Sequence, residues 1–189
     1  MILSHKFDSN YDPAIDNSDI VCPGSDVLGP IKPKYHDDNR NWSPWSGGVK
    51  ASLFENFFKV AFDKNIDFDT DPLKVMLLTN DYAHNPEYKY KTDINPKHEV
   101  AGKGYTAGGI QLSSVTINYN SKTNTISVDA ADVYWPESHF TARHAIVYSA
   151  IKPYHLITHI NFGTNVSCLN GGTFTIAWDS AGIFTQTAS

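Results

Sequence analysis

The chain has 189 residues, of which 19% are charged and 13% are aromatic, and its formal net charge is −5. This length fits one large domain, or one domain with an appendage, and it allows a core of useful size. The mild negative charge, without a basic stripe, argues against nucleic-acid binding. No apolar run approaches the ~20 residues that span a bilayer, so we expect no membrane partner, and we expect no signal peptide. The two cysteines, Cys22 and Cys168, form no CxxC motif, and we expect two free thiols in a reducing cytoplasm.

Residues 1–48 differ in pattern from the rest of the chain. Prolines and glycines punctuate them, and their apolar residues follow neither the helical nor the strand period. A disordered leader is one interpretation, because such a segment alone buries too little apolar surface to offset its ordering entropy. The other is an extended arm that becomes ordered against neighbouring subunits, which two nearby tryptophans favour. The arm residues that we expect to bind a partner are Ile20, Val21, Val27, Leu28, Tyr35, Trp42 and Trp45.

Residues 49–64 carry the strongest helical pattern. Apolar side chains recur between Leu53 and Phe62 with the spacing of one helix face, and Ser52 with Glu55 suggests a capping box. We predict an amphipathic helix whose phenylalanine stripe packs on a sheet. A lipid-binding helix is disfavoured, because the polar face is not strongly basic.

The residues after this helix predict strands separated by turns rich in glycine and proline. Residues 67–72 imitate the start of a calcium loop but lack its glycine and its final glutamate, so we expect a turn. Residues 102–109 lack the order of a phosphate-binding loop, and we expect a turn that enters a strand. The expected strands are 73–79, 110–119, 125–129, 140–148, 154–162 and 174–178, with a loop at 163–172.

The stretch 129–149 predicts the strand around which the domain is organised. From Ala145 to Tyr148 both faces are apolar, which indicates a central strand covered on both sides. Pro136 cannot donate to a strand ladder, so we expect the sheet to break there. The fold class is therefore mainly β: an antiparallel β-sandwich domain at 49–189 with one amphipathic helix, preceded by the extended N-terminal arm.

Few residues suggest chemistry. His155 and His159 are four apart, but they alternate with apolar residues as on a strand, which separates them by ~13 Å, too far for one zinc ion. Asp129, Asp132 and Glu137 gather near a turn, as paired carboxylates of glycosidases do, yet such a group is ordinary in an acidic protein. No nucleophile motif is present. We expect no enzymatic activity, no metal ion and no cofactor.

A short helix and five sequence runs occur in a recognisable order. The runs are Lys74–Thr79 (KVMLLT), Gly102–Gly109 (GKGYTAGG), Asp132–Trp135 (DVYW), Thr141–Arg143 (TAR) and Phe174–Trp178 (FTIAW). In this order they resemble a family of tailed-bacteriophage virion structural proteins, over about residues 49–184. The resemblance implies a non-enzymatic component of the virion, assembled in the cytoplasm of the bacterial host. It transfers no site residues. The N-terminal arm is longer than the usual start of the family, which leaves the position of this member on the particle open.

Three functional hypotheses follow. The first is a capsid decoration (cement) protein that binds the major capsid protein, or other virion proteins, through its arm and forms a homo-oligomer, for which a trimer is one option. The second is a tail, neck or fibre component that uses the arm as a docking peptide. The third is a receptor- or carbohydrate-binding module, in which Tyr88, Tyr90 and Trp135 would stack on sugars, unless Trp135 belongs to the core.

Overall fold

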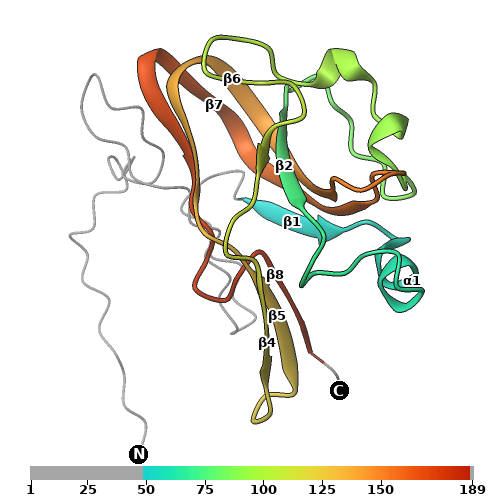
Figure 1. The fold of residues 1–189 in the computed structure, drawn as a ribbon. Coiled ribbons are helices and arrows are strands. Elements are labelled where there is room, and N and C mark those ends of the chain that lie inside the picture. The colour runs from blue at the N-terminus through green and yellow to red at the C-terminus, as the bar shows by residue number, and fades with distance from the viewer. Residues whose placement is uncertain (1–48, 188–189) are drawn as a thin grey trace, which may run out of the picture.

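The computed structural model describes residues 49–187, which form two antiparallel sheets and one short α-helix (Figure 1). The predicted fold class, mainly β and sandwich-like, is confirmed. In spatial order, the larger sheet contains β1 Lys50–Leu53, β7 Leu156–Ile176, β6 Val133–Ser149, β2 Leu73–Leu78 and β3 Ile110–Gln111. The smaller sheet contains β4 Thr116–Asn120, β5 Thr125–Asp129 and β8 Phe184–Thr187. Nothing is described of residues 1–48 and 188–189.

Strand β6 occupies the centre of the five-stranded sheet, between β7 and β2, as predicted for the stretch 129–149. Ala145 and Val147 point into a large core that α1 and the smaller sheet help to close. Ile146 and Tyr148 point into a second core on the opposite face. A run that is apolar on both faces is therefore stable here because both faces are covered.

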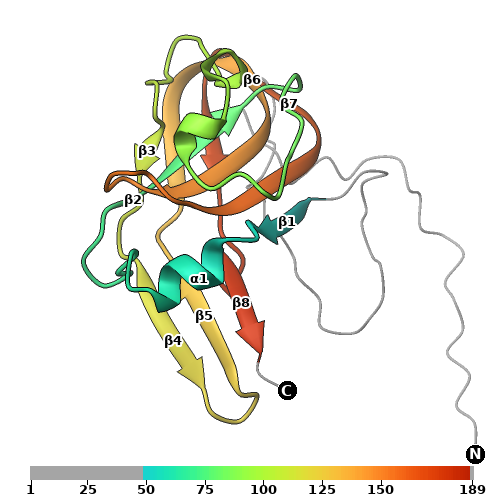
Figure 2. The ribbon, with the colours of Figure 1, turned by 90° about the vertical axis from the view of Figure 1, so that its right-hand side faces the viewer.

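The second core lies beneath a long excursion between β2 and β3. This excursion contains two short 3-10 helices, η1 Lys91–Asp93 and η2 Pro96–His98, and it contributes Tyr82 and Ile94 to the core. Figure 2 shows the excursion folded over the curved β6–β7 pair. The excursion thus serves as a cover for this face of the sheet.

The sheet does not end at Pro136, contrary to prediction. Strand β6 continues through it, but its register against β7 shifts between Trp135 and Ser138, and Glu137 has a φ of 50°. Proline removes one ladder donor, so the pairing is interrupted locally and then resumes. Pro136 therefore causes an irregularity within β6 rather than the end of a strand.

The loop predicted at 163–172 is wrong, because these residues belong to β7. Gly163 has a φ of 77°, and the register against β6 slips near it: His144 pairs with Asn161, whereas Ala142 pairs with Val166. Beyond this irregularity Val166 is buried in the large core. Burial against β6 therefore overrides a local composition that is typical of loops.

The helix predicted at 49–64 is much shorter. The structure has α1 at Phe57–Phe62, and residues 50–53 form β1, which pairs with β7. The expected capping box is absent, since the N-cap is Asn56 and makes no side-chain capping bond. Edge pairing with β7 satisfies the backbone of this segment more completely than the start of an isolated helix would.

The phenylalanine stripe is only partly core. Phe54 and Phe57 are buried, whereas Phe58 is 39% exposed and Phe62 is 83% exposed. Val60 of the last turn is buried in the large core, so the exposed part of α1 is the side that carries Phe58 and Phe62. The prediction that the whole stripe packs on a sheet is therefore wrong for its C-terminal half.

The strand predicted at 110–119 is two strands. Its first part is β3, which pairs with β2, and its second part is β4, which forms a hairpin with β5, the strand predicted at 125–129. The turn before β3 needs glycine at position 109. Its φ is +71°, and a Cβ there would lie 1.9 Å from the carbonyl oxygen of Val75.

Candidate functional site

The residues predicted to bind a partner all lie outside the described part of the chain. They are Ile20, Val21, Val27, Leu28, Tyr35, Trp42 and Trp45. The arm joins the described residues at Val49, directly before β1. The surface beside β1 is therefore the described surface that is nearest to the arm in sequence.

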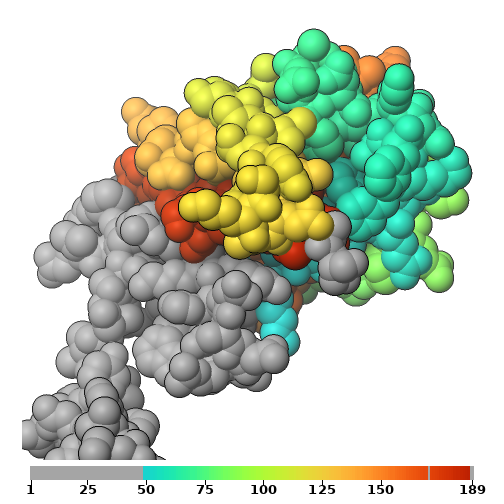
Figure 3. Space-filling view, turned by 90° about the horizontal axis from the view of Figure 1, so that it is seen from below, coloured from blue at the N-terminus to red at the C-terminus, as the bar shows by residue number. Residues whose placement is uncertain are grey.

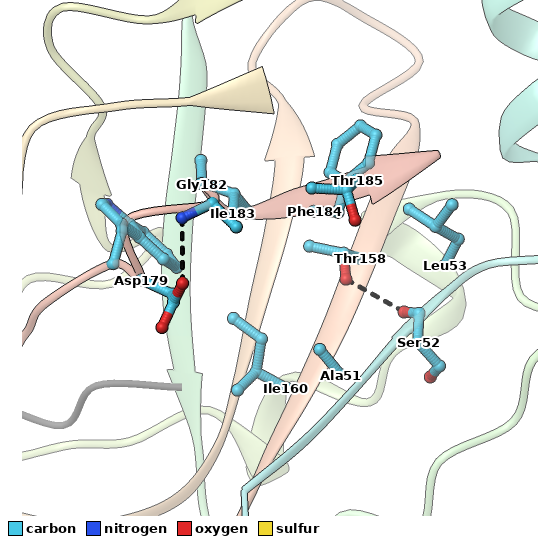
Figure 4. Close-up of a pocket in the computed structure, with 12 residues that line it drawn as sticks. Ala51, Ser52, Leu53, Thr158, Ile160, Asp179, Gly182, Ile183, Phe184 and Thr185 are labelled. Carbon is cyan, nitrogen blue, oxygen red and sulfur yellow. Dashed lines mark hydrogen bonds between the residues drawn. The ribbon is translucent and has the colours of Figure 1, made fainter. Parts of the chain in front are cut away.

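An apolar groove of about 180 Å³ lies beside β1 (Figure 4). β1 forms one wall, the segment from Trp178 to Thr185 forms the other, and Thr158 and Ile160 of β7 lie between them. Among the strands of residues 49–187, both β1 and β8 lie at an edge of their sheet. The groove therefore lies where the edges of the two sheets approach each other.

A tight turn shapes the wall opposite β1. The N–H of Gly182 donates to the carbonyl oxygen of Asp179 over 2.8 Å, and the Asp179 carboxylate accepts from the N–H of Ala181. Gly182 has a φ of +101°, and a Cβ there would lie 2.5 Å from the carbonyl oxygen of Val128. Only glycine fits this close approach of two backbones.

The lining of the groove is suited to binding and offers little for catalysis. Its large side chains are apolar: Leu53, Ile160, Trp178, Ile183 and Phe184. The Thr158 hydroxyl already donates to the carbonyl oxygen of Ser52 over 3.0 Å. Among the described residues that line the groove, Asp179 is the one charged residue. A cavity of roughly this volume with an apolar lining can hold one aromatic ring.

A cluster of histidines lies on the opposite face of the larger sheet from the groove. This is the face covered by the excursion. His159 Nε2 and His144 Nδ1 are 3.0 Å apart, within hydrogen-bonding distance. The ring of His84 stacks on His159, with ring centroids 4.0 Å apart and an interplanar angle of 12°. Tyr82 packs against the rings of both His144 and His159, and Ser52 of β1 approaches His84.

Burial keeps these histidines neutral. Desolvation lowers the pKa of His144 to about 4, and the charges of Arg143 and His84 add to this effect. Desolvation likewise lowers the pKa of His159 to about 3, again with contributions from the neighbouring histidines. The pKa of His84 is lowered by burial alone. The sequence predicted no such cluster, because His144 and His159 meet only through the β6–β7 register.

The cluster does not have the geometry of a metal site. The lone pair of an imidazole lies in the ring plane, so the stacked rings of His84 and His159 cannot both point at one ion. Among residues 49–187, no group of three or more histidines, cysteines, aspartates or glutamates could hold a metal ion.

Other residues singled out by the sequence have structural partners. Glu137 forms an ion pair with Lys103 at 3.0 Å, and this ion pair and its hydrogen bond lower the pKa of Glu137. Asp132 accepts a hydrogen bond from the N–H of Trp178, and Asp129 accepts one from the N–H of Ala130. Asp129 and Asp132 thus accept hydrogen bonds in and across the β5–β6 connection, whereas the ion pair of Glu137 lies at the surface.

The structure tests two further expectations, one for Trp135 and one for the cysteines. Trp135 is buried in the large core, so it cannot stack on a sugar, and the core interpretation is confirmed. Tyr88 is partly buried against the second core. Cys168 is fully buried and is not a free thiol, so the expectation of two free thiols is wrong for this residue. Cys22 lies outside the described residues.

Comparison of the chain with protein-family models, with curated proteins and with solved structures found no match in any of the three. No helix within residues 49–187 is long and apolar enough to cross a membrane. Function must therefore be argued from the groove, the exposed surfaces and the resemblance of the sequence runs.

Proposed function

We propose that the chain is a non-enzymatic structural protein of a bacteriophage virion, and specifically a capsid decoration protein that binds the shell through residues 1–48. The order of the short helix and the five sequence runs supports the virion family. The bacterial host cytoplasm would be the site of assembly. In this proposal the protein acts in many copies, as a homo-oligomer, on the major capsid protein.

The observation that carries the proposal is the apolar groove beside β1. It has the volume of an aromatic side chain, and its large side chains are apolar. It also lies at the point where the arm joins the described residues. Such a groove suits the seating of a protein side chain rather than the turnover of a substrate.

The arm is long enough to contact both the groove and a neighbouring subunit. Trp45 lies four residues before Val49, which is about 13 Å of extended chain, so its indole can reach the groove. The residues further from β1 then have the length to contact a neighbouring subunit. Large aromatic side chains dominate the energy of protein interfaces, which gives Trp42 and Trp45 the leading roles.

The proposal is tested with purified shells of the particle in which the protein occurs. The full chain should bind, whereas a Trp42→Ser/Trp45→Ser double variant should bind about a hundred-fold more weakly, as expected for the loss of two interface hot spots. A chain that starts at residue 49 should show no binding. A Phe62→Ser variant of the full chain, changed at an exposed aromatic of α1 outside the arm, is the matched control and should bind normally.

Undiminished binding by the double variant and by the truncated chain would overturn the role of the arm. Cryo-electron microscopy of whole virions then decides the position. Density repeated over the shell supports decoration, and density confined to the tail or to one vertex would replace it with a tail, neck or fibre role.

A further inference from the structure

Strand β4 is an unprotected edge. Its only strand neighbour within residues 49–187 is β5, and all five of its residues are exposed. Figure 2 shows β4 as the outer strand of the projecting β4–β5 hairpin. Edge strands of monomeric proteins are usually blocked by charges, proline, bulges or short length. The sequence of β4, Thr-Ile-Asn-Tyr-Asn, has no charge and no proline, so its outer backbone groups are open to pairing.

An apolar patch accompanies this edge. Ile117 is 44% exposed and Tyr119 is 63% exposed, and both lie on the same face of β4. Ile126 of β5 pairs with Tyr119 and is 46% exposed. The hairpin, yellow in Figure 3, lies at the surface of the molecule in that view. Contiguous exposed apolar side chains of this kind usually mark an interaction site.

We propose that β4 pairs antiparallel with β4 of a second copy of this chain, about a two-fold axis through Asn118. The side chains of β4 alternate polar, apolar, polar, apolar, polar, and this order is the same in both directions. Antiparallel self-pairing therefore places polar residues opposite polar residues and apolar residues opposite apolar residues. Ile117 comes to lie opposite Tyr119 of the second copy on one face, and the amides of Asn118 meet on the other.

The charges near the hairpin permit this pairing. The whole chain has a net charge of −5, which disfavours self-association in general, but β4 itself is uncharged. Lys122, in the hairpin turn, is the cation nearest to β4 in sequence. In the proposed register the two hairpin turns lie at opposite ends of the paired β4 strands, so the two Lys122 residues do not face each other. No like charges face each other along the shared edge.

The other edge of the same sheet provides the matched control. Asn120, Thr125 and Thr187 form one row across the sheet, so Asn118 and Thr187 lie on the same face at opposite edges. Both are exposed, and Thr187 does not line the groove. Asn118→Lys places two cations at the proposed two-fold axis, whereas Thr187→Lys places the same charge on β8.

The test is sedimentation equilibrium of the full chain and both variants, with circular dichroism to confirm that each is folded. The parent should dimerise, Asn118→Lys should weaken the dimer about ten-fold or more, and Thr187→Lys should leave it unchanged. A monomeric parent at all concentrations would overturn the proposal. So would equal dissociation constants for the parent and Asn118→Lys, or weakening by Thr187→Lys alone.

A cysteine placed at the axis tests the register. Directly opposite residues in an antiparallel pair have Cα atoms ~4.5–5.5 Å apart, which a disulfide can bridge. Asn118→Cys should therefore give a covalent dimer under mild oxidation, and Thr187→Cys should not. The pairing needs no shell, so dimerisation can fail while shell binding through residues 1–48 persists, and the reverse also holds.

Discussion

Strands β2 and β6 of the larger sheet have side chains buried on both faces, whereas every residue of β4 in the smaller sheet is exposed. The larger sheet is covered on one face by α1 and the smaller sheet, and on the other by the excursion. The outer part of the smaller sheet has no such cover within residues 49–187. The strands of the two sheets therefore have different tasks: burial in the larger sheet, and contact in the smaller one.

The two sheets are joined at one end of the smaller sheet. The N–H of Trp178 donates to Asp132 over 3.0 Å, and its indole N–H donates to the carbonyl oxygen of Ala131 over 3.1 Å. Phe184 of β8 packs edge-on against Phe57 of α1, with ring centroids 5.3 Å apart. The smaller sheet is thus anchored near the core, while its hairpin tip projects away (Figure 1). We infer that most of the free energy of folding resides in the larger sheet and its two cores.

The largest expected effect comes from the centre of the larger sheet. Ile146 of β6 is fully buried in the second core. Ile146→Ala should lower the free energy of unfolding by about 2–5 kcal/mol, because it removes buried methyl groups and leaves a cavity. Urea unfolding followed by tryptophan fluorescence measures this loss. A loss below about 1 kcal/mol would show that β6 is not the energetic centre, and the contrast between the two sheets would fail.

Much of this contrast could be predicted from the sequence. The run from Ala145 to Tyr148 indicates burial on both faces, and β6 is indeed the central strand. The length of β7 and the fate of residues 50–53 could not be predicted, because both depend on a partner strand distant in sequence. Local composition favours a loop and a helix there, and tertiary pairing overrides both.

The candidate sites show the same limit. The arm lies outside the described residues, so its predicted role stays a prediction. The groove joins β1 to residues 178–185, and the histidine cluster joins three segments. No spacing of residues along the chain predicts the groove or the histidine cluster. The exposed edge of β4 was within reach of the sequence, since an uncharged, alternating strand beside a hairpin tip is a recognisable pattern.

A smaller effect is expected in the pH dependence of stability, which should arise from the larger sheet. The histidine cluster packs on that sheet, whereas β4, β5 and β8 contain no histidine. The pKa of His144 is lowered to about 4 and that of His159 to about 3, whereas an unfolded histidine has a pKa near 6.5. Between these values the unfolded chain binds protons that the folded chain does not. Stability should therefore fall as the pH drops from 7 to 5, by up to about 1.4 kcal/mol per pH unit for each histidine.

Unfolding in urea at pH 7, 6 and 5 measures this slope. His159→Phe removes one titrating group while keeping an aromatic ring beside His84, so the slope between pH 7 and 5 should become shallower. An unchanged slope in this variant would mean that other groups cause the acid sensitivity. The pH dependence of stability could then not be assigned to the histidine cluster on the larger sheet.

The smallest effect is expected at Ile117, the counterpart of Ile146 in the smaller sheet. Ile117→Ala should change the free energy of unfolding by less than about 0.5 kcal/mol in dilute solution, because the side chain is exposed and leaves no cavity. The same change should weaken self-association, since Ile117 would lose its contact with Tyr119 of the second copy. Unfolding measured at low and at high protein concentration separates the two results. A loss of more than about 1 kcal/mol in dilute solution would show that the hairpin supports the fold, and the division of tasks between the sheets would not hold.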